Sequence, residues 1–193
     1  MFGFDRISKP ARVALLAGGL LVAGGVAPVM PTVSAGPGLP GCPSTTDVIE
    51  GFSKGLGYLV EDGALNRGEA RDARSQFSGW ARDEKGLGCA IRNGMMENGG
   101  ELLAFLGLTP AEMKAAYEDG MSLSEMAEAN GNSEADLLAL LNGMVDEGLD
   151  AFVAAGAFND TVRDAIDAKA EEHIAWGVDY HKGDPVPEGH GSK

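Results

Sequence analysis

The chain of 193 residues is poor in basic side chains, in histidine and in cysteine. It holds 15 Lys and Arg against 29 Asp and Glu, so its formal net charge is −14. Nucleic acids and anionic lipid surfaces bind proteins through a cationic face. The charge balance therefore argues against nucleic acid and an anionic membrane surface as partners, and it favours solubility.

Residues that mark common catalytic and metal sites are absent or badly spaced. One serine matches the G-x-S-x-G pattern, in Gly51-Phe52-Ser53-Lys54-Gly55, but it lies inside a predicted helix and not at the strand-to-helix turn of a nucleophile elbow. The chain has no G-x-x-x-x-G-K-[ST] phosphate loop. The three histidines, His173, His181 and His190, include no pair at the i, i+4 spacing of helical zinc sites. We therefore predict no metal, no cofactor and no enzyme activity. A hydrolase with two converging carboxylates stays as an alternative, because the sequence cannot show which acidic residues meet.

The first 35 residues have the pattern of a secretory signal peptide. Three basic residues precede an apolar run from Val13 to Met30, and Val33-Ser34-Ala35 follows it. We predict that residues 1–35 are a signal peptide and that cleavage follows Ala35, which makes the protein secreted or extracytoplasmic. An uncleaved membrane anchor is the alternative, since the run has about the length needed to span a bilayer. Residues 1–35 hold three basic residues and one acidic residue, so their removal changes the net charge from −14 to −16.

Both cysteines, Cys42 and Cys89, lie in the part predicted to be exported, where disulfides form. A bond between them would close a loop of about 48 residues, which contributes roughly 4 kcal/mol in the chain-entropy model. Lipidation of Cys42 is the alternative, because Leu39-Pro40-Gly41-Cys42 partly matches a lipobox. The two interpretations exclude each other, since a lipidated Cys42 leaves Cys89 unpaired.

Composition and helix signals divide the rest into a Gly/Pro linker over residues 36–45, one helical domain over 46–179 and a disordered polar tail over 180–193. We predict an all-α fold of six to eight helices. Capping patterns mark most helix starts, and glycines mark the ends. The predicted starts are Thr46 or Asp47 with Glu50, Asn66 with Glu69, Thr109 with Glu112, Ser122 with Glu125, Ser133 with Asp136, and Asn159.

The pair Gly99-Gly100 is expected to divide residues 89–107 into two helices, because glycine disfavours helix interiors. Apolar residues recur at spacings of three and four along the other segments and predict the core. The predicted core comprises Ile49, Phe52, Leu56, Leu59, Phe77, Ile91, Leu103, Leu106, Met126, Leu138, Leu141, Val145, Leu149, Phe152 and Ile166.

An internal repeat relates two parts of the chain. The sequence GLGYLVEDGALN over residues 55–66 aligns without gaps with GLDAFVAAGAFN over residues 148–159. Each copy reads as a helix end, a glycine turn, a buried apolar residue and an Asn cap. The repeat predicts two similar αα-hairpins that flank a middle segment of short helices.

Residues 120–142 carry one local resemblance. Gly120-Met121-Ser122-Leu123, an apolar-Ala helix, Asn130-Gly131-Asn132-Ser133, Leu137-Leu138 and Asn142 are similar to the helix-turn-helix core of the lysin motif. That module binds peptidoglycan or chitin and has a strand before and after its two helices. The resemblance implies a glycan-binding surface whose candidate residues are Gly120, Ser122, Leu123, Asn130, Gly131 and Asn142.

A second resemblance covers about 70 residues. Leu108-Thr109-Pro110-Ala111-Glu112-Met113, the segment Ser122 to Ala127 and the helix end Ala155 to Asn159 resemble a set of uncharacterised secreted bacterial proteins that are all-helical. The resemblance implies an architecture but no activity, because that set has no established catalytic residues. The sequence thus favours a secreted, non-catalytic protein that binds an unknown protein or a cell-wall glycan, or acts as a scaffold, at the cell envelope.

Overall fold

The computed structural model describes residues 42–185, and within that range the chain forms helices and no strands. This confirms the predicted all-α fold. The helices are α3 (Thr45–Glu61), α4 (Arg67–Asp83), α5 (Leu87–Leu106), α6 (Pro110–Glu118), α7 (Leu123–Ala129), α8 (Glu134–Ala154) and α9 (Asp160–Gly177). The predicted signal peptide, its cleavage after Ala35, most of the 36–45 linker and residues 186–193 of the tail lie outside the described residues.

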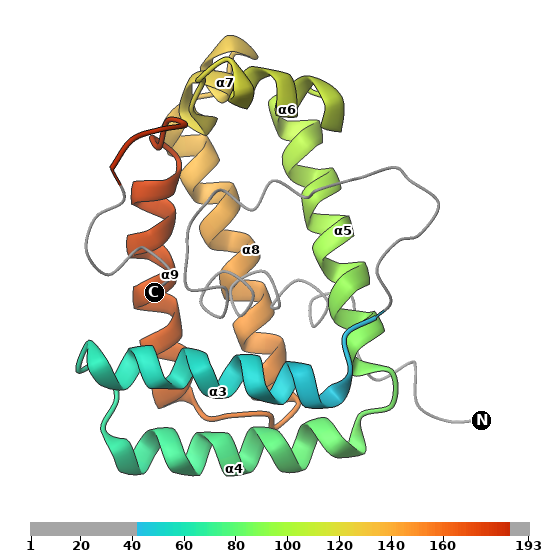
Figure 1. The fold of residues 1–193 in the computed structure, drawn as a ribbon, viewed down its shortest axis with the longest axis vertical. Coiled ribbons are helices and arrows are strands. Elements are labelled where there is room, and N and C mark those ends of the chain that lie inside the picture. The colour runs from blue at the N-terminus through green and yellow to red at the C-terminus, as the bar shows by residue number, and fades with distance from the viewer. Residues whose placement is uncertain (1–41, 186–193) are drawn as a thin grey trace.

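The helices form two sets that cross each other (Figure 1). Helices α5, α8 and α9 run side by side along the long axis, and the antiparallel pair α3–α4 lies across one end of them. The short helices α6 and α7 lie at the opposite end. The two predicted hairpins are therefore α3–α4 and α8–α9, and the segment between them contains the short α6 and α7 together with the long α5.

Most helices begin where the capping patterns predict. Four predicted capping boxes are present, with Asn66, Thr109, Ser122 and Ser133 as the N-caps, and Asn159 caps α9. The first helix differs, because the cap of α3 is Ser44. Its hydroxyl accepts from the backbone N–H of Asp47 at 3.1 Å, and the Asp47 carboxylate accepts from the backbone N–H of Ser44 at 2.9 Å. Aspartate thus replaces the glutamate that this motif normally uses.

The prediction of a helix break at Gly99-Gly100 is wrong, because α5 continues from Leu87 to Leu106. Two interior glycines cost the helix roughly 1 kcal/mol each. Packing offsets this cost, since the side chains of Ile91 and Leu106 are buried in the core. The helix ends instead at Gly107, which has a φ of 63° and so takes the left-handed conformation that closes a helix.

The two copies of the repeat turn at an equivalent glycine. Gly63 and Gly156 have φ angles of 78° and 76°. Their backbone N–H groups donate to the carbonyls of Val60 and Val153, at 3.2 and 2.9 Å. When each residue of the first hairpin is aligned with the residue 93 positions later, several buried residues of α3 and α4 match buried residues of α8 and α9. The matching buried pairs are Leu56 and Leu149, Leu59 and Phe152, Leu65 and Phe158, Ala73 and Ile166, Phe77 and Ala170, and Ala81 and Ile174.

The core forms where the two hairpins cross. Phe52 of α3 stacks on Phe77 of α4 with ring centroids 4.0 Å apart, and also on Phe158 of the α8–α9 turn at 5.8 Å. Trp80 of α4 meets Phe152 of α8 edge to face at 5.3 Å. Few aromatic residues occur in the chain, and these five join the hairpins to each other.

Ten of the predicted core residues are buried: Leu56, Leu59, Phe77, Ile91, Leu106, Met126, Val145, Leu149, Phe152 and Ile166. The other five, Ile49, Phe52, Leu103, Leu138 and Leu141, are partly buried and pack against the core. At the start of α8 the buried residue is Leu137 and not its neighbour Leu138. Among residues 42–185, no helix is both long and apolar enough to cross a membrane.

The disulfide between Cys42 and Cys89 is present, with Cα atoms 4.7 Å apart. It joins the residues before α3 to the first turn of α5. Gly88 permits this approach, because a Cβ atom at that position would lie 1.8 Å from the carbonyl oxygen of Pro43. The lipidation alternative for Cys42 is incompatible with this bond.

We expect Gly88→Ala to lower the free energy of unfolding by about 1–3 kcal/mol, because a backbone must move to admit the methyl group. The matched control is Gly100→Ala in the same helix, where no atom lies within 4 Å of the added Cβ. That variant should gain roughly 0.5–1 kcal/mol from reduced backbone entropy. Urea denaturation of both variants checks the expectation. Equal effects of the two substitutions would contradict the close approach at Pro43.

The helix caps predict a loss of stability in acid. Hydrogen bonds from the cap hydroxyl and backbone N–H lower the pKa of Asp47, Glu112 and Asp136, and the N–H of Ser122 lowers that of Glu125. A pKa that is lower in the folded chain gives stability above the unfolded value, and this is lost as pH falls through the folded value. The free energy of unfolding should therefore decrease below about pH 4.

Urea denaturation between pH 6 and 2 tests this with a Glu112→Gln and Asp136→Asn double variant, whose stability should depend less steeply on pH in that acid range. The control is Glu134→Gln, because Glu134 is an exposed residue of the first turn of α8 and not the capping partner of Ser133. If the double variant retains the full acid dependence of the original chain, the caps are not its source.

Candidate functional site

The residues predicted to bind glycan lie at three separate places. Ser122 caps the start of α7 and is 1% exposed, and Leu123 follows it partly buried. Asn130 and Gly131 lie at the other end of this seven-residue helix, on the order of 10 Å away at 1.5 Å per residue. Asn142 lies more than two turns into α8, and its Oδ1 is buried without a hydrogen bond to any described residue.

The segments beside this unit are helices. Gly120 ends α6 with a φ of 92°, and α8 continues past Asn142 to Ala154. A lysin motif has strands at both of these positions. Asn130 also has a structural partner, because its Nδ2 donates to the carbonyl of Phe105 at 3.0 Å. The neighbouring Asn132 donates to the same oxygen at 2.7 Å, so both amides fix the end of α5 to the α7–α8 turn.

The chain after α9 packs against the start of α7. The sequence did not predict this contact. The backbone N–H of Ser124 donates to the carbonyl of Val178 at 2.9 Å. The Ser124 hydroxyl donates to the Asp179 carboxylate at 2.7 Å, and the hydroxyls of Ser122 and Ser124 lie 3.2 Å apart. The Ser124–Asp179 bond connects residues that are 55 positions apart, so no local pattern could have predicted it.

The tail that was predicted to be disordered begins with a hydrogen-bonded turn over residues 181–184. Asp184 accepts from the backbone N–H of His181 at 3.0 Å. The imidazole lies between two carboxylates, with Nε2 3.3 Å from Glu125 and Nδ1 3.4 Å from Asp184. Both ring nitrogens thus face carboxylates rather than a serine hydroxyl. The arrangement is a joint between α7 and the C-terminal segment rather than a Ser–His pair suited to nucleophilic attack.

Metal binding is not supported by the described residues. Within residues 42–185, no group of three or more His, Cys, Asp or Glu side chains is arranged to hold a metal ion. His173 lies in α9 and His181 in the C-terminal turn, whereas His190 lies outside the described residues.

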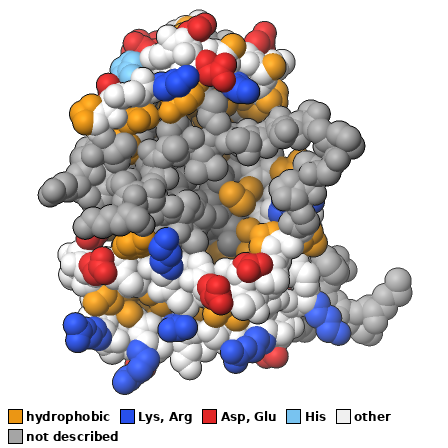
Figure 2. Space-filling view, viewed as in Figure 1, with side chains coloured by type: hydrophobic (Ala, Val, Ile, Leu, Met, Phe, Trp, Pro, Cys, Tyr) orange, Lys and Arg blue, Asp and Glu red, His pale blue; other side chains and the backbone are white. Residues whose placement is uncertain are grey.

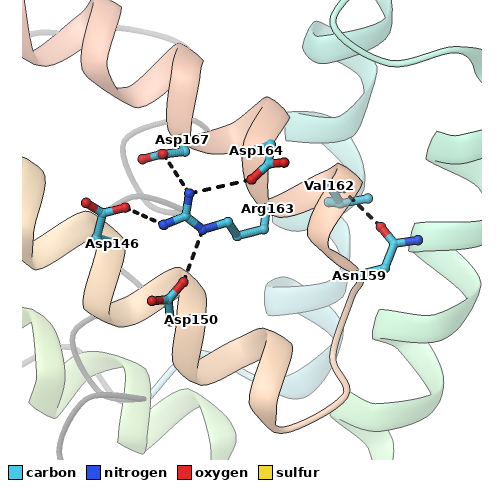
Figure 3. A network of polar contacts seen from close by, with 7 residues as sticks. All are labelled: Asp146, Asp150, Asn159, Val162, Arg163, Asp164 and Asp167. Atoms are coloured by element: carbon cyan, nitrogen blue, oxygen red, sulfur yellow. Dashed lines mark hydrogen bonds and ion pairs between the residues drawn. The ribbon is translucent and has the colours of Figure 1, made fainter.

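The densest cluster of charge surrounds Arg163 of α9 (Figure 3). Its Nε donates to Asp150 at 3.1 Å, and its Nη1 donates to Asp167 at 2.8 Å. Its Nη2 donates to Asp146, and Asp164 lies 3.6 Å from Nη1. One guanidinium therefore faces four carboxylates from two helices, which fixes α8 to α9 and leaves the cluster with an excess of negative charge.

Two pKa shifts follow from this arrangement. Burial opposes the charge on Arg163, but the hydrogen bond to Asp150 and the charges of Asp167 and Asp146 outweigh it, so the pKa of the guanidinium rises. Burial and the charge of Asp146 raise the pKa of Asp167, against the attraction of Arg163. Because the pKa of Asp167 is higher in the folded chain, its ionisation reduces stability as pH rises above about 4.

Lys169 makes a second link, between the two hairpins. Its ammonium group lies 2.9 Å from Asp62 at the end of α3 and 2.8 Å from Glu172 on its own helix, and its side chain is 15% exposed. Burial lowers the pKa of Lys169, but the hydrogen bonds to Glu172 and Asp62 have the larger combined effect and raise it. Like Arg163, this residue serves packing between elements.

Comparisons of the chain with protein-family models, with curated proteins and with solved structures gave no match.

We expect Arg163→Met to lower the free energy of unfolding by about 1–3 kcal/mol, because it leaves four carboxylates facing one another in a partly buried place. The matched control is Arg71→Met. Arg71 pairs with Asp72 at 3.5 Å, but both side chains are about four-fifths exposed, at 81% and 78%. Its removal should change stability by less than about 0.5 kcal/mol. Urea denaturation that ranks the two variants equally would contradict a stabilising role for the Arg163 cluster.

Proposed function

We propose that this protein is secreted and that it acts without catalysis, by binding or scaffolding at the cell envelope. The observation that supports the location best is the disulfide between Cys42 and Cys89, the two cysteines of the chain. Such bonds form and persist in oxidising compartments outside the cytoplasm. The signal-peptide pattern of residues 1–35 agrees with that location.

The use of the polar side chains supports a binding or scaffolding role. Carboxylates with a lowered pKa cap helices, as Glu112 and Asp136 do. The serine–carboxylate pair Ser124 and Asp179 joins α7 to the C-terminal segment. The charged cluster around Arg163 joins α8 to α9. The caps close the ends of their own helices, whereas the other two sets of contacts fix one element to another. Together they give a rigid body suited to holding a partner.

Binding of peptidoglycan or chitin through residues 120–142 is the second candidate. The exposure of Asn130 and Gly131 favours it, because a sugar could reach both residues, although the Asn130 amide also donates to Phe105. The helices on both flanks weigh against it, because the glycan-binding loops of a lysin motif are supported by strands. We therefore place an envelope protein first as the partner.

We expect the purified chain to co-sediment saturably with isolated bacterial envelopes and to lose this binding when the envelopes are treated with protease. It should stay in the supernatant with insoluble peptidoglycan or chitin alone. If it pellets with either glycan, and Leu123→Asp abolishes pelleting while Leu102→Asp does not, the glycan candidate takes first place. Circular dichroism must show that both variants fold.

Two results would contradict the proposal altogether. One is the absence of binding to every envelope fraction. The other is turnover of a cell-wall substrate that an alanine substitution at one acidic residue abolishes, because this would make the protein a hydrolase with the paired carboxylates considered from the sequence.

A further inference from the structure

The two hairpins carry opposite charges at three equivalent positions. The shift of 93 positions that matches their buried residues also matches a row of arginines on α4 with a row of carboxylates on α9. The equivalent pairs are Arg67 and Asp160, Arg71 and Asp164, Arg74 and Asp167, and Ser78 and Glu171. At three of these four positions the repeated scaffold thus presents an arginine in one copy and a carboxylate in the other.

The arginine face of α4 consists of Arg67, Arg71, Arg74 and Arg82. Steps of four and three residues place the first three on one side of the helix, and Arg82 continues the row two turns later. All four are exposed, whereas Ala73, Phe77 and Ala81 on another side of α4 are buried. Within the described part of the chain, Arg71 has an ion pair with Asp72, and the other three have none.

The carboxylate face of α9 consists of Asp160, Asp164, Asp167 and Glu171. Its first two steps, of four and three residues, are those of the arginine face, and a further step of four leads to Glu171. The helix likewise follows an Asn cap. Arg163 neutralises one charge, but Asp146 and Asp150 of α8 contact the same guanidinium. The face therefore stays negative.

The two faces do not pair within one molecule. Asp164 and Asp167 pair with Arg163 of their own helix, and the Arg71 ion pair is with its neighbour Asp72. In the space-filling view, Lys and Arg side chains gather at the end formed by α3 and α4 (Figure 2). The arginine face is exposed, and so are Asp160, Asp164 and Glu171 of the carboxylate face, whereas the Asp167 side chain is 20% exposed. Another molecule can therefore reach both faces.

We propose that the arginine face of one molecule docks on the carboxylate face of a second copy of this chain. Arginine is suited to this because its planar guanidinium forms two hydrogen bonds to one carboxylate. Contact between two different faces is heterologous, so each dimer leaves one face of each kind unused. Such contacts extend into open chains of molecules unless the rotation between copies closes a ring.

The association is weak and depends on salt. Exposed ion pairs contribute little each, and the net charge of −14 makes two molecules repel as whole bodies. At an ionic strength of about 0.1 M the Debye length is about 10 Å, so faces in contact respond to their local charges more than to the net charge. At about 1 M the length falls to about 3 Å and the local attraction is screened as well. This inference goes beyond the proposed function, because it concerns a second copy and not an envelope ligand.

Sedimentation of the purified chain tests the proposal at protein concentrations up to about 1 mM, where weak complexes are populated. The average mass should rise with concentration at about 0.1 M salt and return to that of the monomer at about 1 M. The triple variant Arg67→Asp, Arg71→Asp, Arg74→Asp should lower the association constant at least about 10-fold. The variant Asp160→Arg, Asp164→Arg, Glu171→Arg should do the same. An equimolar mixture should recover association, because each variant then meets a complementary face.

The matched control is Lys54→Asp, Lys114→Asp, Lys182→Asp, which changes the net charge as much as the arginine variant does but alters exposed residues outside both faces. It should associate more strongly than the arginine variant. A monomer at every concentration and salt level would overturn the proposal, as would a mixture that fails to recover association. Binding of inorganic polyphosphate to the arginine face of a protein that stays monomeric would also overturn it, and would assign that face to an anionic polymer.

Discussion

Stacking of aromatic rings where the two hairpins cross is the contact on which the rest of the structure depends. Phe52 and Phe77 come from the first hairpin, and Phe152 and Phe158 from the second. Aromatic rings bury a large area each and prefer offset or edge-to-face contact, so they fix the crossing angle as well as the distance. In a chain with 6% aromatic residues, this concentration gives two separate hairpins a single core.

The other long-range contacts join further elements to the two crossed hairpins or reinforce the crossing. Lys169 joins the end of α3 to α9, and the disulfide joins the residues before α3 to α5. At the far end, the Ser124 and Asp179 side chains hold α7 against the C-terminal segment. Each of these contacts joins elements that are distant in sequence.

Features that depend on neighbouring residues could be predicted from the sequence. The caps at Asn66, Thr109, Ser122 and Ser133 use a hydroxyl or amide and a carboxylate three residues apart, and this spacing alone defines them. The repeat predicted both hairpins because its glycine turn and Asn cap are also local. The continuity of α5 through Gly99-Gly100 was not predictable in this way, since tertiary packing offsets a local preference.

The candidate sites were predictable to a smaller extent. A net charge of −14 concealed the arginine face, because a sum over the chain carries no information on which side of a helix the charges lie. The Arg163 cluster depends on the register of α8 against α9. The contact between α7 and the segment after α9 depends on where α9 ends. The six residues of the lysin-motif resemblance matched in order, yet that order did not specify their flanks, which are helices.

The disulfide also determines how the molecule would respond to tension. Cys42 and Cys89 enclose residues 43–88, and α3 and α4 both lie inside that covalent loop. A pull between the N-terminal side of Cys42 and the C-terminal segment would pass through the sulfur atoms directly into α5. The first hairpin would bear none of the force along its backbone. An applied load would first extend the chain after Cys89, while the residues of the arginine face would keep their spacing.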